Sequence, residues 1–183
     1  MYNWMWGQNR NELKERDLGY YVGYRICESY YNRSKDKKKA IKEMIGLDYS
    51  DDKAVERFVD QSGFFSKSIK MIHADYEKRR PTVISITPFE NGNKKVKPGR
   101  VTITVQFSKP LDKGRTGIDF GPLGESSCPK IMPERAWSED GKSWTFTAEL
   151  KPNQHYQILI SNNFRLETGE RLKPYLIDIT TTD

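Results

Sequence analysis

The run from Trp137 to Ile160 constrains the fold of this chain more than any other segment. It contains Asp140-Gly141, a tight-turn signal, because glycine accepts a positive φ and aspartate hydrogen-bonds the turn backbone. After the turn, apolar side chains occupy every second position, namely Trp144, Phe146, Ala148 and Leu150. This is the period of a strand with one buried face. The Lys151-Pro152-Asn153 break and a new alternation from Tyr156 then predict an antiparallel hairpin.

Everything after Pro81 follows the same pattern of short strands separated by turn residues. The strands that we predict cover residues 83–87, 101–107, 117–120, 130–136, 143–150, 156–161 and 176–181. About seven short strands in roughly 100 residues are typical of an immunoglobulin-like sandwich. Residues 81–183 are therefore predicted to form an antiparallel β-sandwich.

Residues 1–80 show helical periodicity instead. We expect helices over residues 16–31, 36–47, 51–62 and 66–80, with N-caps at Asp36 and at Ser50 or Asp51. Pro81 disfavours a helical conformation at the residue before it, which sets a boundary at about residue 80. The predicted fold class is α+β in two separate domains, a small helical bundle (1–80) followed by the sandwich (81–183).

The predicted helix at 16–31 carries apolar or aromatic side chains on two sides: Leu18, Val22, Ile26 and Tyr30 on one, and Tyr20, Tyr24, Cys27 and Tyr31 on the other. Such a distribution predicts a helix buried around most of its circumference. Gly19 and Gly23 predict close approach of a neighbouring backbone, since each costs about 1 kcal/mol in helix propensity. We infer that this helix packs against a larger part of a longer chain or against a partner.

Composition argues against several classes of function. The chain has 31 basic and 25 acidic residues, an excess too small and too dispersed to predict nucleic-acid binding. The lysines from Lys35 to Lys42 are expected to form the solvated face and first turn of a helix, with a nucleic-acid or anionic-surface role as the alternative. No apolar run is long enough to span a membrane. Residues 1–7 lack the pattern of a signal peptide and look like the middle of a domain.

The sequence offers few groups for catalysis or for metal binding. His73 and His155 are its two histidines, Cys27 and Cys128 its two cysteines, and neither type shows zinc-ligand spacing. The glycines of 117–124 match no phosphate-binding loop. Free thiols are expected, with Cys27 buried and Cys128 in a loop. We therefore predict no cofactor, no metal site and no enzymatic activity of this chain alone.

Five residues are candidates for ligand binding. Arg25 and Glu28 lie three apart on the first predicted helix, where Tyr20 and Tyr24 would shape a cleft beside them. The alternative is a structural ion pair among core tyrosines, because such networks are common. Trp137 is a candidate for stacking on a sugar, whereas Trp144 is expected in the core.

The second half resembles the bacterial Ig-like domains first associated with S-layer proteins. The resemblance lies in Pro81-Thr-Val83-Ile-Ser85-Ile-Thr-Pro88-Phe-Glu-Asn-Gly92, in Phe107-Ser-Lys-Pro110-Leu-Asp112, in Leu150-Lys-Pro152-Asn-Gln-His-Tyr156 and in Thr168-Gly169. It covers essentially all of 81–183. It implies a non-catalytic, extracytoplasmic module of a surface or secreted protein.

The first half resembles the C-terminal helical end of HExxH zinc-dependent peptidases of Bacteroidetes-like bacteria. The resemblance lies in Trp4-Met-Trp6-Gly7, in Arg16-Asp17-Leu-Gly19-Tyr20 and in the tyrosine-rich helix that follows. It implies an upstream peptidase-like domain as a partner. The chain itself contains no HExxH, so it holds no complete zinc site.

These observations favour a non-catalytic C-terminal portion of a bacterial envelope or secreted protein, with the sandwich used for spacing, docking or substrate presentation. Two alternatives remain. The chain is a glycan-binding or adhesion module, or it is an accessory subunit that completes a zinc peptidase in trans. A protein or a cell-surface glycan is the expected partner.

Overall fold

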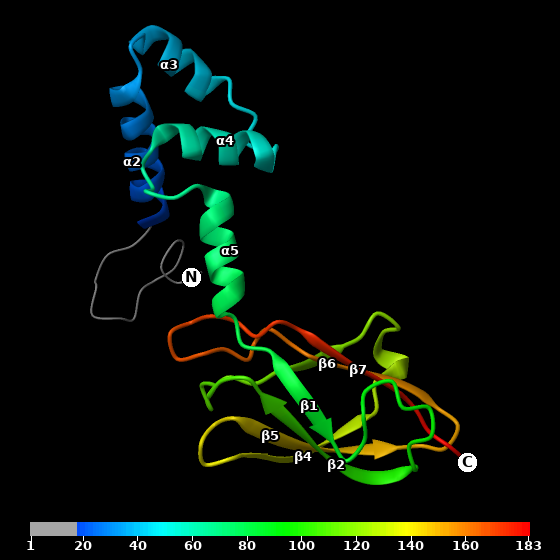
Figure 1. The fold of residues 1–183 in the computed structure, drawn as a ribbon. Helices are drawn as coiled ribbons and strands as arrows, with labels where there is room; N and C mark the ends of the chain where they lie inside the picture. The colour runs from blue at the N-terminus through cyan, green and yellow to red at the C-terminus, as the bar shows by residue number, and fades with distance from the viewer. Residues whose placement is uncertain (1–17) are drawn as a thin grey trace. The chain divides into compact units, whose positions relative to one another are not determined.

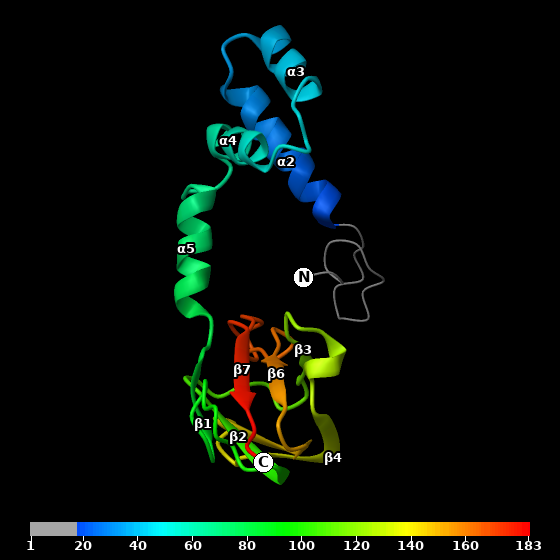
Figure 2. The same cartoon turned by 90° about the vertical axis from the view of Figure 1, so that its right-hand side faces the viewer.

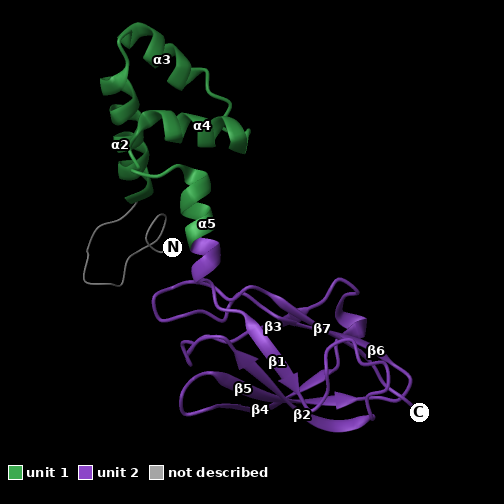
Figure 3. Cartoon of the chain, in the orientation of Figure 1, with its two compact units in different colours: residues 1–75 green, residues 76–183 purple. Residues whose placement is uncertain are grey.

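The computed structural model describes residues 18–183 of the chain (Figure 1). Its contacts fall into two compact units, residues 1–75 and 76–183 (Figure 3). The division lies inside helix α5 (Ile69–Arg79), a few residues before the boundary predicted at about residue 80. The predicted Trp4-Met-Trp6 motif lies outside the described residues.

The first unit is helical, with α2 (Leu18–Arg33), α3 (Lys37–Ile45), α4 (Asp52–Ser62) and the start of α5. The predicted caps are confirmed. The Asp36 carboxylate accepts a hydrogen bond of 3.0 Å from the Lys39 backbone N–H, and that of Asp51 accepts one of 2.9 Å from Lys53. Such bonds satisfy backbone donors that the first helical turn leaves unpaired.

Two details of the helical prediction are wrong. Helix α5 begins at Ile69 and not near Ser66, because the Ser68 side chain accepts the hydrogen bond from the Met71 backbone N–H at 3.3 Å. Gly23 was expected beside another backbone, yet a Cβ atom built there would meet nothing within 4 Å. Ser66 and Gly23 both fit the helical periodicity of the sequence. The pattern alone therefore does not reveal the later start of α5 or the open space beside Gly23.

Helices α3 and α4 pack against one side of α2. The Ser29 hydroxyl donates to the Ser62 carbonyl at 2.8 Å, and the rings of Tyr30 and Phe58 lie 4.8 Å apart. Ala40 is fully buried. Helix α2 itself contains no buried residue, so the prediction of a helix buried around most of its circumference is wrong for the described part of this chain.

The second unit is a sandwich of two antiparallel sheets (Figure 2). Four strands form one sheet in the order β1-β2-β5-β4, and three form the other in the order β3-β6-β7. The strands are β1 (Val83–Thr87), β2 (Gly99–Phe107), β3 (Ile118–Phe120), β4 (Lys130–Trp137), β5 (Ser143–Leu150), β6 (His155–Ile160) and β7 (Tyr175–Thr180). This is the strand order of the seven-stranded immunoglobulin sandwich.

Aromatic side chains fill the space between the sheets. Trp144 is 1% exposed and its ring lies 5.2 Å from that of Phe146 and 5.1 Å from that of Phe164. The predicted inward alternation of β5 is confirmed, since Trp144, Phe146, Ala148 and Leu150 are all buried. Gly141 forms the predicted turn before β5 with a φ of 66°.

A hydrogen bond closes the connection between β5 and β6. The Tyr156 hydroxyl accepts a bond of 2.9 Å from the backbone N–H of Lys151, five residues earlier in the chain. A tyrosine near the start of the sixth strand, bonded back to the preceding connection, is the tyrosine corner of immunoglobulin sandwiches. On the four-stranded sheet, the hydroxyls of Thr102 and Thr147 meet at 3.2 Å between β2 and β5.

Candidate binding face on helix α2

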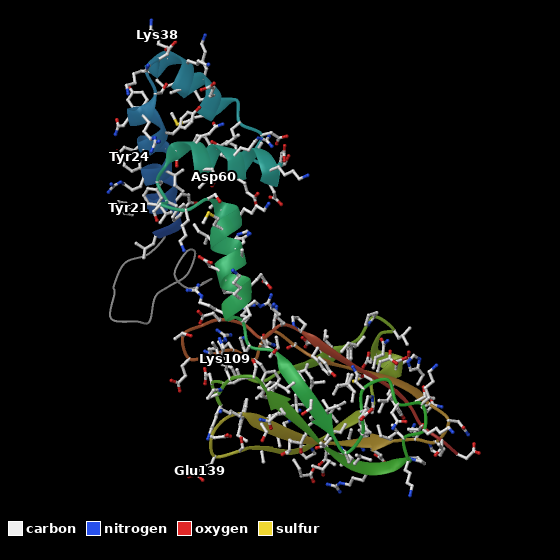
Figure 4. All side chains as sticks on the ribbon, in the orientation of Figure 1. Tyr21, Tyr24, Lys38, Asp60, Lys109 and Glu139 are labelled. Atoms are coloured by element: carbon white, nitrogen blue, oxygen red, sulfur yellow. The ribbon has the colours of Figure 1, made fainter. Side chains whose placement is uncertain are left out.

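The N-terminal part of α2 exposes aromatic rings. Tyr20 is 69% exposed, Tyr21 56% and Tyr24 60%, and Figure 4 labels Tyr21 and Tyr24 on this helix. A helix that packs on one side normally presents charged residues to solvent on the other. A row of exposed tyrosines on a well-formed helix is therefore a candidate contact surface.

Four side chains on this face form one continuous network. Arg25 Nε lies 3.0 Å from Glu28 Oε2, and the Tyr24 hydroxyl donates to Glu28 Oε1 at 3.1 Å. On its other side, the Arg25 guanidinium donates to the Tyr21 hydroxyl at 3.0 Å. All of these pairs are three or four residues apart, the spacing at which helical side chains meet.

The network has an electrostatic consequence for Tyr24. Its hydrogen bond to Glu28, together with the negative charge of that carboxylate, raises the pKa of Tyr24 above the ordinary 10.0. Tyr24 thus stays a neutral hydroxyl that donates to Glu28. Its ring and hydroxyl are held in one place without becoming a nucleophile.

A shallow pocket of about 390 Å³ opens beside this network. Its lining combines two aromatic rings, a carboxylate, an amide, a thiol and a thioether, from Tyr24, Tyr31, Glu28, Asn32, Cys27 and Met44. The Lys37 ammonium lies 4.7 Å from the Tyr31 ring centre. Flat apolar rings beside planar hydrogen-bonding groups suit a ligand that has both apolar and hydroxyl-bearing faces.

The structure brings together some of the predicted site residues. Arg25, Glu28 and Tyr24 form the network, and Tyr20 lies on the same exposed helix. Trp137 is not part of it, because it belongs to the other unit, where its half-buried ring lies 5.9 Å from that of Phe107 and 5.8 Å from that of Phe164. Its role as a ligand residue stays a prediction.

Sequence reasoning did not assign Tyr21, Asn32 or Met44 to the site. The four-residue spacing of Tyr21 and Arg25 was a usable signal, since it places their side chains together on a helix. Met44 comes from α3 and reaches the pocket through tertiary packing, which no local pattern indicates.

The sandwich has a groove of about 570 Å³ that is lined in part by β3 and β4. It contains Cys128, whose pKa is raised by burial and secondarily by the charge of Glu125. A raised pKa disfavours the reactive thiolate. Both cysteines are half-buried free thiols, so the expectation that Cys27 is fully buried is not met.

Two further observations bear on the candidate chemistry. Among the described residues, no three His, Cys, Asp or Glu side chains gather closely enough to hold a metal ion. No helix within residues 18–183 has the length and apolar character needed to cross a membrane.

Comparison with known proteins identifies the family of the sandwich. A family model described as a bacterial Ig-like domain matches residues 77–181. Two solved structures, the S-layer protein rSbsC(31-844) and surface layer protein SbsC, domains 1-6, are each 18% identical with a TM-score of 0.38. In both cases the match covers 90% of this chain and 22% of the other. No curated protein matches.

The chain therefore spans about a fifth of the length of those S-layer structures. No comparison tests the resemblance of residues 1–80 to zinc-dependent peptidases, which stays a prediction. The family match, by contrast, confirms the resemblance seen in residues 81–183 and agrees with the strand order and the Tyr156 corner. Because it covers more than half of the sequence, the chain belongs to the bacterial Ig-like domain family.

Proposed function

We propose that this chain is a non-catalytic portion of a bacterial cell-envelope or secreted protein. Residues 81–183 act as a spacing or docking module, and residues 1–80 form a separate helical domain. The observation that carries the proposal is the seven-stranded sandwich of the bacterial Ig-like family. Fold alone does not define function, so the proposal rests also on how this sandwich uses its side chains.

Several aromatic and polar side chains of the sandwich are engaged in structural contacts. The aromatic rings of Trp144, Phe146 and Phe164 pack in the core. Asp140 accepts hydrogen bonds from the Ser138 hydroxyl and the Lys142 backbone N–H at its turn. His155 pairs with Asp178 on the surface, at 2.8 Å. These contacts stabilise turns and strands, which suits a module that holds its neighbours apart.

Two measurements test this proposal. Fractionation of the producing cells with an antibody against the chain is expected to find it in the envelope or in the medium, and an exclusively cytosolic location would contradict the proposal. Incubation of the full chain with peptide substrates and added zinc is expected to give no hydrolysis. Robust hydrolysis that a chelator abolishes would instead support the peptidase alternative.

A second candidate function is glycan binding at the α2 face. The observation that favours it is the pocket in which the Tyr24 and Tyr31 rings flank the Glu28 carboxylate and the Asn32 amide. Aromatic rings can stack on the C–H face of a sugar, while carboxylates and amides hydrogen-bond its hydroxyls. The Tyr24–Glu28 hydrogen bond holds these groups before any ligand arrives, which lowers the ordering cost of binding.

A glycan array with the full chain would test this second candidate. Saturable binding is expected, and Tyr31→Ala or Glu28→Gln should reduce it by about tenfold, the effect of losing one good contact of roughly 1.4 kcal/mol. Phe120→Ala is a matched control, because Phe120 is an exposed aromatic residue on β3 in the sandwich. Equal loss in the control, or no binding at all, would exclude glycan recognition at this face.

A further inference from the structure

The outward face of α3 combines aliphatic and basic side chains in a way that the helical fold does not require. Ile45 is 79% exposed and Ile41 44%. Just beyond the helix, Tyr49 is 63% exposed, and its hydroxyl donates to the Met44 carbonyl at 3.0 Å, which fixes its ring beside the end of α3. The three positions are four residues apart and make an apolar ridge.

Contacts on the opposite side of α3 fix this orientation. Ala40 is fully buried, and the Lys37 ammonium donates to the Tyr31 carbonyl at 2.7 Å and to the Asn32 carbonyl at 3.1 Å. The Tyr30 hydroxyl donates to Glu43 at 2.8 Å. Because each residue advances the helix by about 100°, an inward Ala40 places Lys38, Lys42 and Ile45 on the opposite side of α3 and Ile41 at its flank. Lys42 also borders a pocket that Phe58 of α4 lines.

The ridge is flanked by positive charge. Lys38 and Lys42 are exposed, and Lys35 precedes the helix; no ion pair or hydrogen bond is found for these three ammonium groups within the described residues. Figure 4 shows Lys38 extending away from α3. The nearby acidic groups have other partners: Glu43 accepts from Tyr30 and pairs with Lys39, and the Asp48 carboxylate accepts from Ser50.

We propose that the ridge formed by Ile41, Ile45 and Tyr49, with Lys38 and Lys42 beside it, binds the surface of an anionic lipid bilayer. A membrane interface takes up both kinds of group at once. Aliphatic and tyrosine side chains enter the boundary between headgroups and acyl chains, while lysines reach back to the anionic headgroups. A soluble polyanion would satisfy the lysines but leave the isoleucines in water.

The expected binding is reversible and depends on salt. Each lysine near an anionic surface strengthens binding by about fivefold, and this contribution weakens as salt screens the charges. Partial burial of the aliphatic side chains adds to it. The contact lies along the membrane surface, consistent with the finding that no described helix is able to span a bilayer.

Co-sedimentation of the full chain with vesicles tests the proposal. Vesicles of equimolar phosphatidylcholine and phosphatidylglycerol should bind the chain at least about tenfold more tightly than vesicles of phosphatidylcholine alone. The double variant Lys38→Glu/Lys42→Glu should lose more than about tenfold in affinity. Lys94→Glu/Lys95→Glu is the matched control, with the same change of net charge on exposed lysines of the sandwich. Equal losses in the two variants would overturn the proposal.

The apolar part of the contact has its own test. Ile41→Ser/Ile45→Ser should weaken binding by about tenfold, whereas Ile84→Ser, at a 65% exposed isoleucine on β1, should leave it unchanged. Undiminished binding by the first variant would assign the surface to a polyanion and overturn the membrane proposal. A gain-of-signal test is also available. Fluorescence of Ile45→Trp should be quenched by brominated lipid more strongly than that of Ile84→Trp, and equal quenching would contradict the proposal.

Discussion

The phenolic oxygen of Tyr156, a residue 5% exposed at the start of β6, accepts a hydrogen bond of 2.9 Å from the Lys151 backbone N–H. Tyr156→Phe removes the acceptor and leaves that N–H unpaired. The free energy of unfolding should fall by about 1 kcal/mol in urea denaturation. Tyr175→Phe is the control, because Tyr175 is half-buried against the same core and no hydrogen bond of its hydroxyl is found among the described residues. Similar losses in both variants would contradict a specific role for the Tyr156 bond.

The aromatic core predicts a large effect at Trp144. This side chain is 1% exposed and packs against Phe146 and Phe164, so Trp144→Ala should lower the free energy of unfolding by about 3–5 kcal/mol. Leu123→Ala, at a residue 50% exposed, should change it by less than about 0.5 kcal/mol. A loss below about 1 kcal/mol at Trp144 would show that the core is not packed as described.

Gly141 predicts a backbone effect at the turn before β5. Its φ of 66° lies in the left-handed region, and an added Cβ would lie 3.3 Å from the Leu111 carbonyl oxygen. Gly141→Ala should therefore lower the free energy of unfolding, measured by urea denaturation, by about 1 kcal/mol or more. Gly141→Asn should cost less, because asparagine tolerates this conformation better than alanine. If asparagine costs as much as alanine, contact with Leu111 rather than backbone strain dominates.

Asp178 predicts an acid-sensitive contribution to stability. Hydrogen bonds from Gln157 and His155 hold the pKa of this carboxyl below its ordinary value of 3.8. The depressed pKa means that the ionised form stabilises the folded state above about pH 4, and this contribution is lost as the pH falls through the folded-state pKa. Because the side chain is partly exposed, solvent screening keeps the effect small.

Urea denaturation between neutral and acidic pH measures this contribution. Asp178→Asn should be less stable than the wild type at neutral pH, and the difference should shrink below about pH 4. Asp119→Asn, which removes the same charge at an exposed position of β3, is the control. A constant difference between Asp178→Asn and wild type at every pH would show that the lost stability is not electrostatic.

Local alternation was enough to predict strand β5. Trp144 and Phe146 alternate with threonines, and a one-residue shift in register would expose every apolar side chain of β5, so the pattern leaves little freedom. The Asp36 and Asp51 caps were predictable for a similar reason, because a single side chain satisfies donors within the same turn.

The surroundings of α2 could not be predicted in this way. Its two apolar stripes are real, but periodicity shows only which residues share a face and not whether anything covers that face. Tyr30 is covered by Phe58, whereas Tyr24 is left to solvent, and only tertiary packing decides between these outcomes. The site network followed from spacing, since Arg25 and Glu28 are three apart, but the contribution of Met44 to the pocket did not.

The contact between the hydroxyls of Thr102 and Thr147 depends little on pH or on salt concentration. Neither hydroxyl titrates over the range in which proteins are folded, and a neutral contact is not screened by ions. The Arg100–Glu134 ion pair, which also involves β2, is by contrast exposed, so both pH and salt concentration affect it. The contact between the Thr102 and Thr147 hydroxyls should therefore persist at low and high salt concentration and from mildly acidic to mildly alkaline pH.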